Sequence, residues 1–204
     1  PKSKNFVVSE SFKEAFETLT SHAKNPHVIS SGILGACVLF TLVGCFTFVN
    51  LHLSDAPYQL STADLANIFS IYLIGMVITP LSAKITTRFG MTTTIILAVL
   101  TSAIGIGMTL MTPLWVVIVG LTLMSSGVFV TQSATISYLT SHVKQGRSLA
   151  SGLYYMSYYG GGFIGAWICA IAYAQGQWLW TVGLILMMQI IALAVVIGFM
   201  RGRG

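Results

Sequence analysis

A few polar side chains interrupt long apolar stretches of this sequence, and they have the chemistry to bind a small molecule. Gln132 is the clearest case, because an amide without a partner in an apolar environment is costly. Ser125 and Phe129 precede it at helical spacing, so the three side chains share one face of a helix. Gln132 is therefore expected to contact a ligand, and a hydrogen bond to another helix is the alternative.

Asn50 and a group of tyrosines are the other candidates for lining a ligand cavity. Asn50 follows Thr47 by three residues near the end of an apolar stretch, where an amide can bind a ligand or cap the helix. Four tyrosines, Tyr154, Tyr155, Tyr158 and Tyr159, are spaced to form an aromatic belt on one helix, and the first three are the candidates for lining the cavity. Such rings can bound a cavity while their hydroxyl groups donate hydrogen bonds. Packing against neighbouring helices is the competing interpretation.

Small residues follow the tyrosines at a spacing that permits close contact between helices. Ser157, Gly161 and Gly165 repeat at intervals of four, which lets two helix backbones approach each other. These glycines could also absorb bending during a conformational change. Static close packing and a conformational role both remain open at this point.

Neither a metal site nor an enzyme is indicated. Cys37, Cys45 and Cys169 lack the paired spacing of metal or redox sites, so we expect buried thiols and no cofactor. An intramembrane serine protease is the enzymatic alternative, and residues 125–127 read Ser-Ser-Gly. All four histidines, however, fall near the ends of apolar stretches rather than inside them. We therefore predict that the protein is not an enzyme.

The composition places these residues in a membrane protein. Of 204 residues, 55% are hydrophobic and only 7% are charged, whereas soluble domains carry about 25% charged residues. So few charges cannot cover a soluble globule. The ten Lys and Arg residues are also too sparse to form a nucleic-acid-binding patch. The lipid bilayer is the expected partner, and nucleic acid is not.

The charged residues leave uncharged intervals that fit membrane-spanning helices of about 20 residues. Pro113 divides one of the two longest intervals, and the polar turn at 174–177 divides the other. The sequence therefore predicts an all-α integral membrane bundle over 27–200. Its six spans are expected near 28–52, 62–82, 91–111, 114–140, 148–173 and 178–200.

The basic residues predict the orientation of this bundle. All ten fall on one side of the six-span arrangement, in the segments before, between and after pairs of spans. Basic residues favour the cytoplasmic side, so both termini are expected in the cytoplasm. Trp115, Trp178 and Trp180 are expected to anchor the opposite interface.

The two ends of the chain are expected to lie outside the membrane. Segment 1–26 predicts a cytoplasmic interdomain linker, and 201–204 a short cytoplasmic tail. Ser11 and Glu14 form a capping-box pattern, followed by apolar residues at helical spacing. A short amphipathic helix over 11–23 is therefore predicted, on the membrane surface or against the ends of the spans. A docking site for a partner is the functional alternative.

The segment that joins the second and third predicted spans resembles the loop signature of the major facilitator superfamily. That signature reads Gly-x-x-x-Asp-Arg-x-Gly. Here Arg88 and Gly90 match it, whereas Ala83 and Thr87 replace the first glycine and the aspartate. We expect Lys84 and Arg88 to hold cytoplasmic helix ends together, with lipid headgroup contact as the alternative. The missing aspartate puts a charge-relay role in doubt.

Two further segments extend this resemblance over nearly the whole chain. The opening residues 1–6 look like the central loop of such transporters, and residues 154–165 look like their eleventh helix. The chain therefore resembles helices 7–12, the C-terminal half of a bacterial drug-efflux or arabinose-efflux-like permease. Such a half consists of two inverted three-helix repeats, in which the third and sixth helices face lipid.

The resemblance implies alternating-access transport of a small molecule across the bacterial inner membrane. The partner would be an N-terminal six-helix half of the same transporter. No charged residue lies inside a predicted span, so any proton-coupling acid is expected in that other half. A stand-alone membrane scaffold or a homodimerising half-transporter is the alternative.

Overall fold

The computed structural model describes residues 12–200, apart from the side chains of residues 12, 13, 72 and 74–76. All regular elements of this part are helices. They are α1 (Phe12–Lys24), α2 (Pro26–Ser54), α3 (Thr62–Phe89), α4 (Met91–Met108), α5 (Leu114–His142), α6 (Arg147–Val195) and the short η1 (Val196–Met200). The predicted capping residue Ser11 and the predicted tail 201–204 lie outside the described residues.

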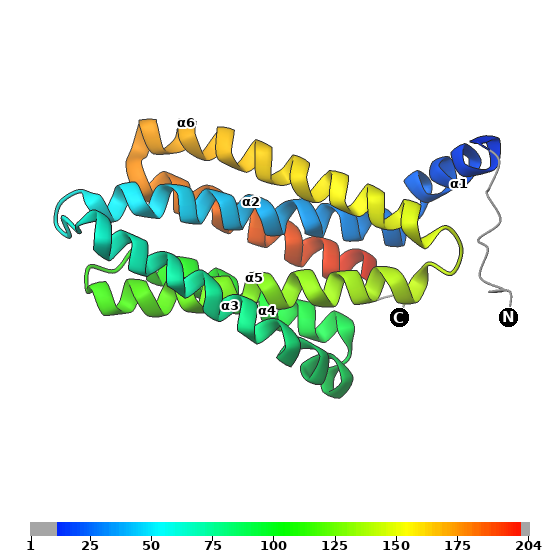
Figure 1. Cartoon of the computed structure of the whole chain (residues 1–204), viewed down its shortest axis with the longest axis horizontal. Coiled ribbons are helices and arrows are strands. Elements are labelled where there is room, and N and C mark those ends of the chain that lie inside the picture. Colours follow the sequence, from blue (N-terminus) through cyan, green and yellow to red (C-terminus); the bar gives the residue numbers. More distant parts are fainter. Residues whose placement is uncertain (1–11, 201–204) are drawn as a thin grey trace, which may run out of the picture.

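Helix α6 consists of two arms joined by a sharp bend. Gly176 and Gln177 leave the helical conformation, and Gln177 has a positive φ of 56°. The chain reverses there, so residues 147–175 and residues 178–195 run side by side in opposite directions (Figure 1). The bend falls inside the polar turn that the sequence predicts at 174–177.

The helices run back and forth along one axis, so the bundle has two ends (Figure 1). One end carries α1 and the α3–α4 and α5–α6 connections, and we call it the cationic end. The other end carries the α2–α3 and α4–α5 connections and the bend of α6, and we call it the cation-free end. The described lysines and arginines beyond residue 13 all belong to the cationic end: Lys24, Lys84, Arg88, Lys144 and Arg147.

Local sequence determines where the helices begin and end. The Asn25 side chain accepts a hydrogen bond of 2.9 Å from the His27 backbone N–H, and Pro26 starts α2. Ser61 and Asp64 form a reciprocal capping box at the start of α3. Gly90 has a φ of 80°, which suits glycine and lets α4 follow α3 directly.

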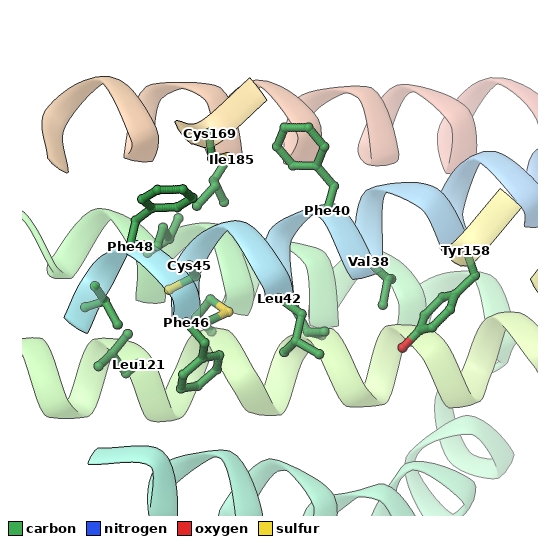
Figure 2. Close-up of a cluster of buried hydrophobic side chains, with 14 of the residues drawn as sticks. Val38, Phe40, Leu42, Cys45, Phe46, Phe48, Leu121, Tyr158, Cys169 and Ile185 are labelled. Atoms are coloured by element: carbon green, nitrogen blue, oxygen red, sulfur yellow. The ribbon is translucent and has the colours of Figure 1, made fainter. Parts of the chain in front are cut away.

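Helix α2 lies between α5 and the two arms of α6, and its two sides carry the largest apolar cluster. Figure 2 shows Phe40 and Phe48 pointing toward α6, whereas Leu42 and Phe46 point toward α5. A Cβ atom on Gly161 would lie 2.3 Å from the Ala36 carbonyl oxygen, so only glycine permits this approach between α6 and α2. The small-residue spacing therefore marks a close helix contact.

Four helices are long and apolar enough to cross a membrane, counted over the described residues. They are Pro26–Ser54, Met91–Met108, Leu114–His142 and the bent Arg147–Met200. A helix also covers the second predicted span, because α3 begins at Thr62 and continues to Phe89, beyond the expected end near 82. Large apolar side chains such as Val77 and Phe163 are exposed on the outside of the bundle, which suits a lipid environment.

Candidate functional site

The strongest candidate site is a groove of about 620 Å³ between α2 and α3. Leu39, Leu42, Val43, Phe46, Thr47, Asn50 and Phe69 line it. Phe46 and Phe69 face each other with ring centroids 6.2 Å apart, so aromatic surface dominates one wall. Among the residues that line it, Asn50 and Thr47 supply the polar groups. An apolar groove with few polar groups is typical of a small-molecule site.

Asn50 has an unused hydrogen-bond acceptor in this groove. Its amide nitrogen donates a hydrogen bond of 2.8 Å to the Phe46 carbonyl oxygen, one turn earlier in α2. Its Oδ1 atom is buried and has no hydrogen-bond partner. A buried acceptor without a partner is costly, so a ligand donor at this point would be favoured. The geometry therefore shows the helix-bound amide, and contact between Asn50 and a ligand stays a prediction.

The predicted tyrosine belt forms a continuous chain of ring contacts on the first arm of α6. Tyr154 and Tyr158 are buried, whereas Tyr155 is 40% and Tyr159 65% exposed. Adjacent rings have centroids 5.2–6.3 Å apart. Figure 2 shows Tyr158 beside Val38, reaching past α2 toward α5. The belt thus continues the aromatic face of α2 toward the cationic end.

Gln132 and Phe129 lie on α5, outside the groove that holds Asn50. Both are half-buried, and Phe129 packs against the main apolar cluster. The Gln132 amide makes no hydrogen bond within the described part of the chain. The structure therefore does not gather all the predicted cavity residues into one groove. Ligand contact by Gln132 stays a prediction.

Gly165 and Gly161 both lie against α2. A Cβ atom on Gly165 would lie 2.8 Å from the Phe40 Cα atom, close enough to force the helices apart. Gly161 also lines an apolar groove of about 460 Å³ between α1, α2 and α6. Close packing explains both glycines, and their conformational role stays a prediction.

Lys84, Arg88 and Gly90 lie at the exposed junction of α3 and α4. The Arg88 guanidinium lies 5.4 Å from the centroid of the Phe89 ring. Neither cation forms an ion pair with an acidic residue in the described chain. Their predicted role in holding helix ends together therefore rests on the resemblance alone.

Comparison with known proteins identifies the family. The sequence profile of the Major Facilitator Superfamily matches residues 5–203, nearly the whole chain. This chain belongs to the major facilitator superfamily. Members of the family are transporters, so the chain belongs to a multi-pass membrane transporter and is not an enzyme. The match confirms the resemblance that Arg88 and Gly90 suggested.

The related transporters are longer than this chain. It is 27% identical over 165 residues to an uncharacterized transporter of Buchnera aphidicola subsp. Schizaphis graminum, covering 80% of this chain and 40% of that protein. It is 25% identical over 176 residues to the uncharacterized MFS-type transporter YybF of Bacillus subtilis, covering 86% of this chain and 44% of YybF. The chain therefore spans less than half the length of these relatives.

A buried polar contact that was not predicted from the sequence joins three helices of this major facilitator chain. Gln189, on the second arm of α6, donates hydrogen bonds of 3.0 Å to Thr41 Oγ1 and 3.1 Å to Ser102 Oγ. Gln189 is only 6% exposed. The resemblance placed this arm on the lipid-facing side. One side of it is indeed apolar and exposed, but Gln189 binds α2 and α4 on the other.

A second missed cluster joins α2 and α5 at the cationic end. His27 Nδ1 and the buried Tyr138 hydroxyl oxygen are 2.7 Å apart. The rings of His27 and His142 stack with centroids 4.6 Å apart. These histidines lie at opposite ends of their helices in sequence, so only the antiparallel pairing of α2 with α5 brings them together. No short motif marks them.

The three predicted tryptophan anchors lie at the cation-free end, but one of them is not at an interface. Trp115 and Trp180 are exposed, as an interfacial anchor requires. Trp178 is 3% exposed, so its prediction as an anchor was wrong. Its indole N–H points to Thr109, the residue that follows α4, 3.2 Å from Oγ1 and 3.3 Å from the carbonyl oxygen. Trp178 therefore fixes the bend of α6 against α4.

The described residues hold no group of three His, Cys, Asp or Glu side chains that could bind a metal ion. All three cysteines are buried and unpaired thiols, as predicted. Near the cation-free end, the Tyr58 hydroxyl donates a hydrogen bond of 3.1 Å to the Met111 carbonyl oxygen. Partial burial raises the pKa of this hydroxyl, which therefore stays a donor at neutral pH.

Proposed function

We propose that this chain is the C-terminal six-helix half of a secondary active transporter that moves a small molecule across a bacterial inner membrane. Its six spans would be α2, α3, α4, α5 and the two arms of α6. They would form two inverted three-helix repeats, and both termini would be cytoplasmic. Efflux is the direction that the sequence resemblance favours.

The observation that carries the proposal is the groove between α2 and α3. Aromatic surface lines it, and its wall holds Asn50, whose buried Oδ1 atom has no hydrogen-bond partner, on a helix whose other side is packed. A polar group left without a partner inside an apolar wall is expected where a ligand supplies the partner. Its neighbour, the tyrosine belt, adds further rings along the same face.

Two further observations support the half-transporter arrangement. The chain spans 40% and 44% of the two relatives described above, which leaves room for a second unit of similar size. The described cations all lie at one end, as expected when α1 and the α3–α4 and α5–α6 connections are cytoplasmic. Proton coupling is then assigned to the other half, because the described spans supply no buried carboxylate.

Transport by the full-length protein in membrane vesicles tests the proposal. Ethidium and arabinose represent the drug and sugar classes that the resemblance suggests. We expect outward movement of one of them to stop when a protonophore removes the proton gradient. Transport that continues without a gradient would contradict proton coupling. Transport by this chain alone as a homodimer would favour the alternative half-transporter.

Substitutions in the same assay test the site itself. Asn50→Ala removes the free acceptor and is expected to raise the substrate KM by about three- to tenfold. Gln132→Ala is expected to impair substrate binding without preventing membrane insertion. Ser54→Ala is the matched control, because the exposed Ser54 hydroxyl bonds only to the carbonyl oxygen of Leu51 in its own helix. An unchanged KM for Asn50→Ala would remove the groove as the substrate site.

A further inference from the structure

A second cavity, distinct from the groove of Asn50, opens at the cation-free end. It has a volume of about 600 Å³ and lies where α2 and α4 end and α6 bends. Its polar groups come from His52, Asp55, Tyr173 and Gln177, and its apolar walls include Trp178 and Leu110. The cavity thus combines one carboxylate with several aromatic rings.

The aromatic wall of this cavity is ordered by contacts within the wall and by contacts to residues behind it. The Trp178 indole N–H is bound to Thr109, as described above. The His52 ring stacks on Trp178 with centroids 5.5 Å apart and planes 11° from parallel. Tyr173 stacks on Phe48 with centroids 5.5 Å apart. A wall that is already ordered loses little conformational entropy when a ligand binds.

The charge of the cavity has no compensating cation nearby. Asp55 is exposed and lines the cavity together with Tyr173. The described lysines and arginines beyond residue 13 belong to the opposite end of the bundle, so none of them pairs with Asp55. The carboxylate therefore presents an unneutralised negative charge beside aromatic surface.

We propose that this cavity binds an ammonium group. A carboxylate supplies the charge that an ammonium ion needs, and an adjacent aromatic face attracts the same ion through its quadrupole. An anion would be repelled by Asp55, and a neutral sugar would donate hydrogen bonds to the carboxylate but would lack the attraction between opposite charges. The ammonium group could belong to a soluble amine or to the headgroup of phosphatidylethanolamine. The assignment does not depend on transport through the groove of Asn50.

Calorimetric titration of the purified full-length protein with choline tests this site. The detergent should contain no amine, and 3,3-dimethylbutan-1-ol serves as the uncharged isostere of choline. We expect saturable binding of choline and none of the isostere. Asp55→Asn is expected to weaken choline binding about three- to tenfold. Asp55→Glu, which keeps the charge, should retain binding better than Asp55→Asn.

Asp64→Asn is the matched control for charge, because it removes another carboxylate at the same end but outside this cavity. It should leave choline affinity unchanged, and the melting temperature of each variant checks folding. The proposal is overturned if choline does not bind saturably, if the isostere binds equally, or if Asp55→Asn binds as the unmodified protein does. Failure of the transport assay would leave this result untouched.

Nanodiscs distinguish the two sources of the ammonium group. One set contains phosphatidylethanolamine with phosphatidylglycerol, and the other contains phosphatidylglycerol alone. Weaker apparent choline affinity in the first set would indicate that the lipid headgroup occupies the cavity. Equal affinity in both sets would indicate a soluble amine. Either result supports an ammonium site at Asp55.

Discussion

Polar residues on the two sides of α2 differ in whether neighbouring helices supply their hydrogen-bond partners. On the packed side, Thr41 accepts a hydrogen bond from Gln189, and that amide also binds Ser102. On the groove side, Asn50 keeps a buried oxygen without a partner. Both environments are apolar, so residue type alone does not separate a structural role from a binding role. The difference lies in whether the surrounding helices supply the partner.

This contrast leads to opposite expectations for mutations. A polar group whose partners lie in neighbouring helices should affect stability when it is removed. A polar group that awaits a ligand should affect binding and leave stability nearly unchanged. Four substitutions test this distinction, and they follow in order of decreasing loss of stability.

Gly161→Leu is expected to have the largest effect, because it acts on the close contact that supports both sides of α2. The Cβ atom of the new side chain would lie 2.3 Å from the Ala36 carbonyl oxygen, so the backbone of one of the two helices must move. We expect a loss of more than about 3 kcal/mol of stability, measured by thermal unfolding of the purified protein in detergent. Gly160→Leu is the neighbouring control, because its Cβ atom would meet nothing within 4 Å. Equal loss in both variants would contradict the packing argument.

Gln189→Leu should have the next largest effect. The substitution keeps a side chain of similar size but removes both hydrogen bonds that join the second arm of α6 to α2 and α4. We expect a loss of about 1–2 kcal/mol, since interhelical hydrogen bonds in membranes are modest. Chemical or thermal unfolding in detergent measures it.

A triple variant checks that this loss comes from the hydrogen bonds. Gln189→Leu combined with Thr41→Val and Ser102→Ala removes all three polar groups. It should recover part of the stability, because no buried hydroxyl is left without its partner. A triple variant that is less stable by the sum of the three single effects would contradict a shared polar contact.

Asn50→Ala sharpens the comparison from the groove side. It loses one hydrogen bond within its own helix but also removes an unpartnered buried oxygen, and these effects oppose each other. We expect a stability change of no more than about 0.5 kcal/mol, smaller than that of Gln189→Leu, although substrate KM rises. Gln189→Leu should therefore lower stability more, as measured by unfolding, whereas Asn50→Ala should change substrate KM, as measured by transport. A large loss of stability for Asn50→Ala would make Asn50 structural.

Much of this arrangement could be predicted from local sequence, because the relevant physics is local. Pro113 and the polar turn before Trp178 mark chain reversals through backbone chemistry, and the structure has reversals there. Asn50 lines an apolar groove, and its role in binding a substrate stays a prediction. The role of Gln189, by contrast, was not predicted.

The missing information is long-range. Thr41 and Ser102 lie 148 and 87 residues from Gln189 in the chain, so no spacing rule connects them. The burial of Trp178 likewise depends on Thr109, which only the packing of α6 against α4 brings near. The stacking of His27 on His142 depends on the antiparallel pairing of α2 and α5. Helix ends follow from sequence, whereas partners across helices require the fold.

Tyr154→Phe should lose the least stability of the four variants, and it tests whether the tyrosine belt has a structural role or a binding role. Tyr154 is buried against Gly35, yet its hydroxyl group has no hydrogen-bond partner. Removing that hydroxyl costs no described bond and relieves an unpaired polar atom. We therefore expect a change between zero and a gain of about 1 kcal/mol in thermal unfolding.

Tyr138→Phe is the matched control, because it removes a hydroxyl group of equal size and burial that does have a partner. That hydroxyl lies 2.7 Å from His27 Nδ1, so its loss should destabilise the protein by about 0.5–1.5 kcal/mol. If Tyr154→Phe loses as much stability as Tyr138→Phe, the Tyr154 hydroxyl has a partner in the folded protein. Its role is then structural, like that of Gln189. If Tyr154→Phe keeps its stability while transport falls, the Tyr154 hydroxyl has a binding role, like that proposed for Asn50. Its hydrogen-bond partner would then be present only during transport.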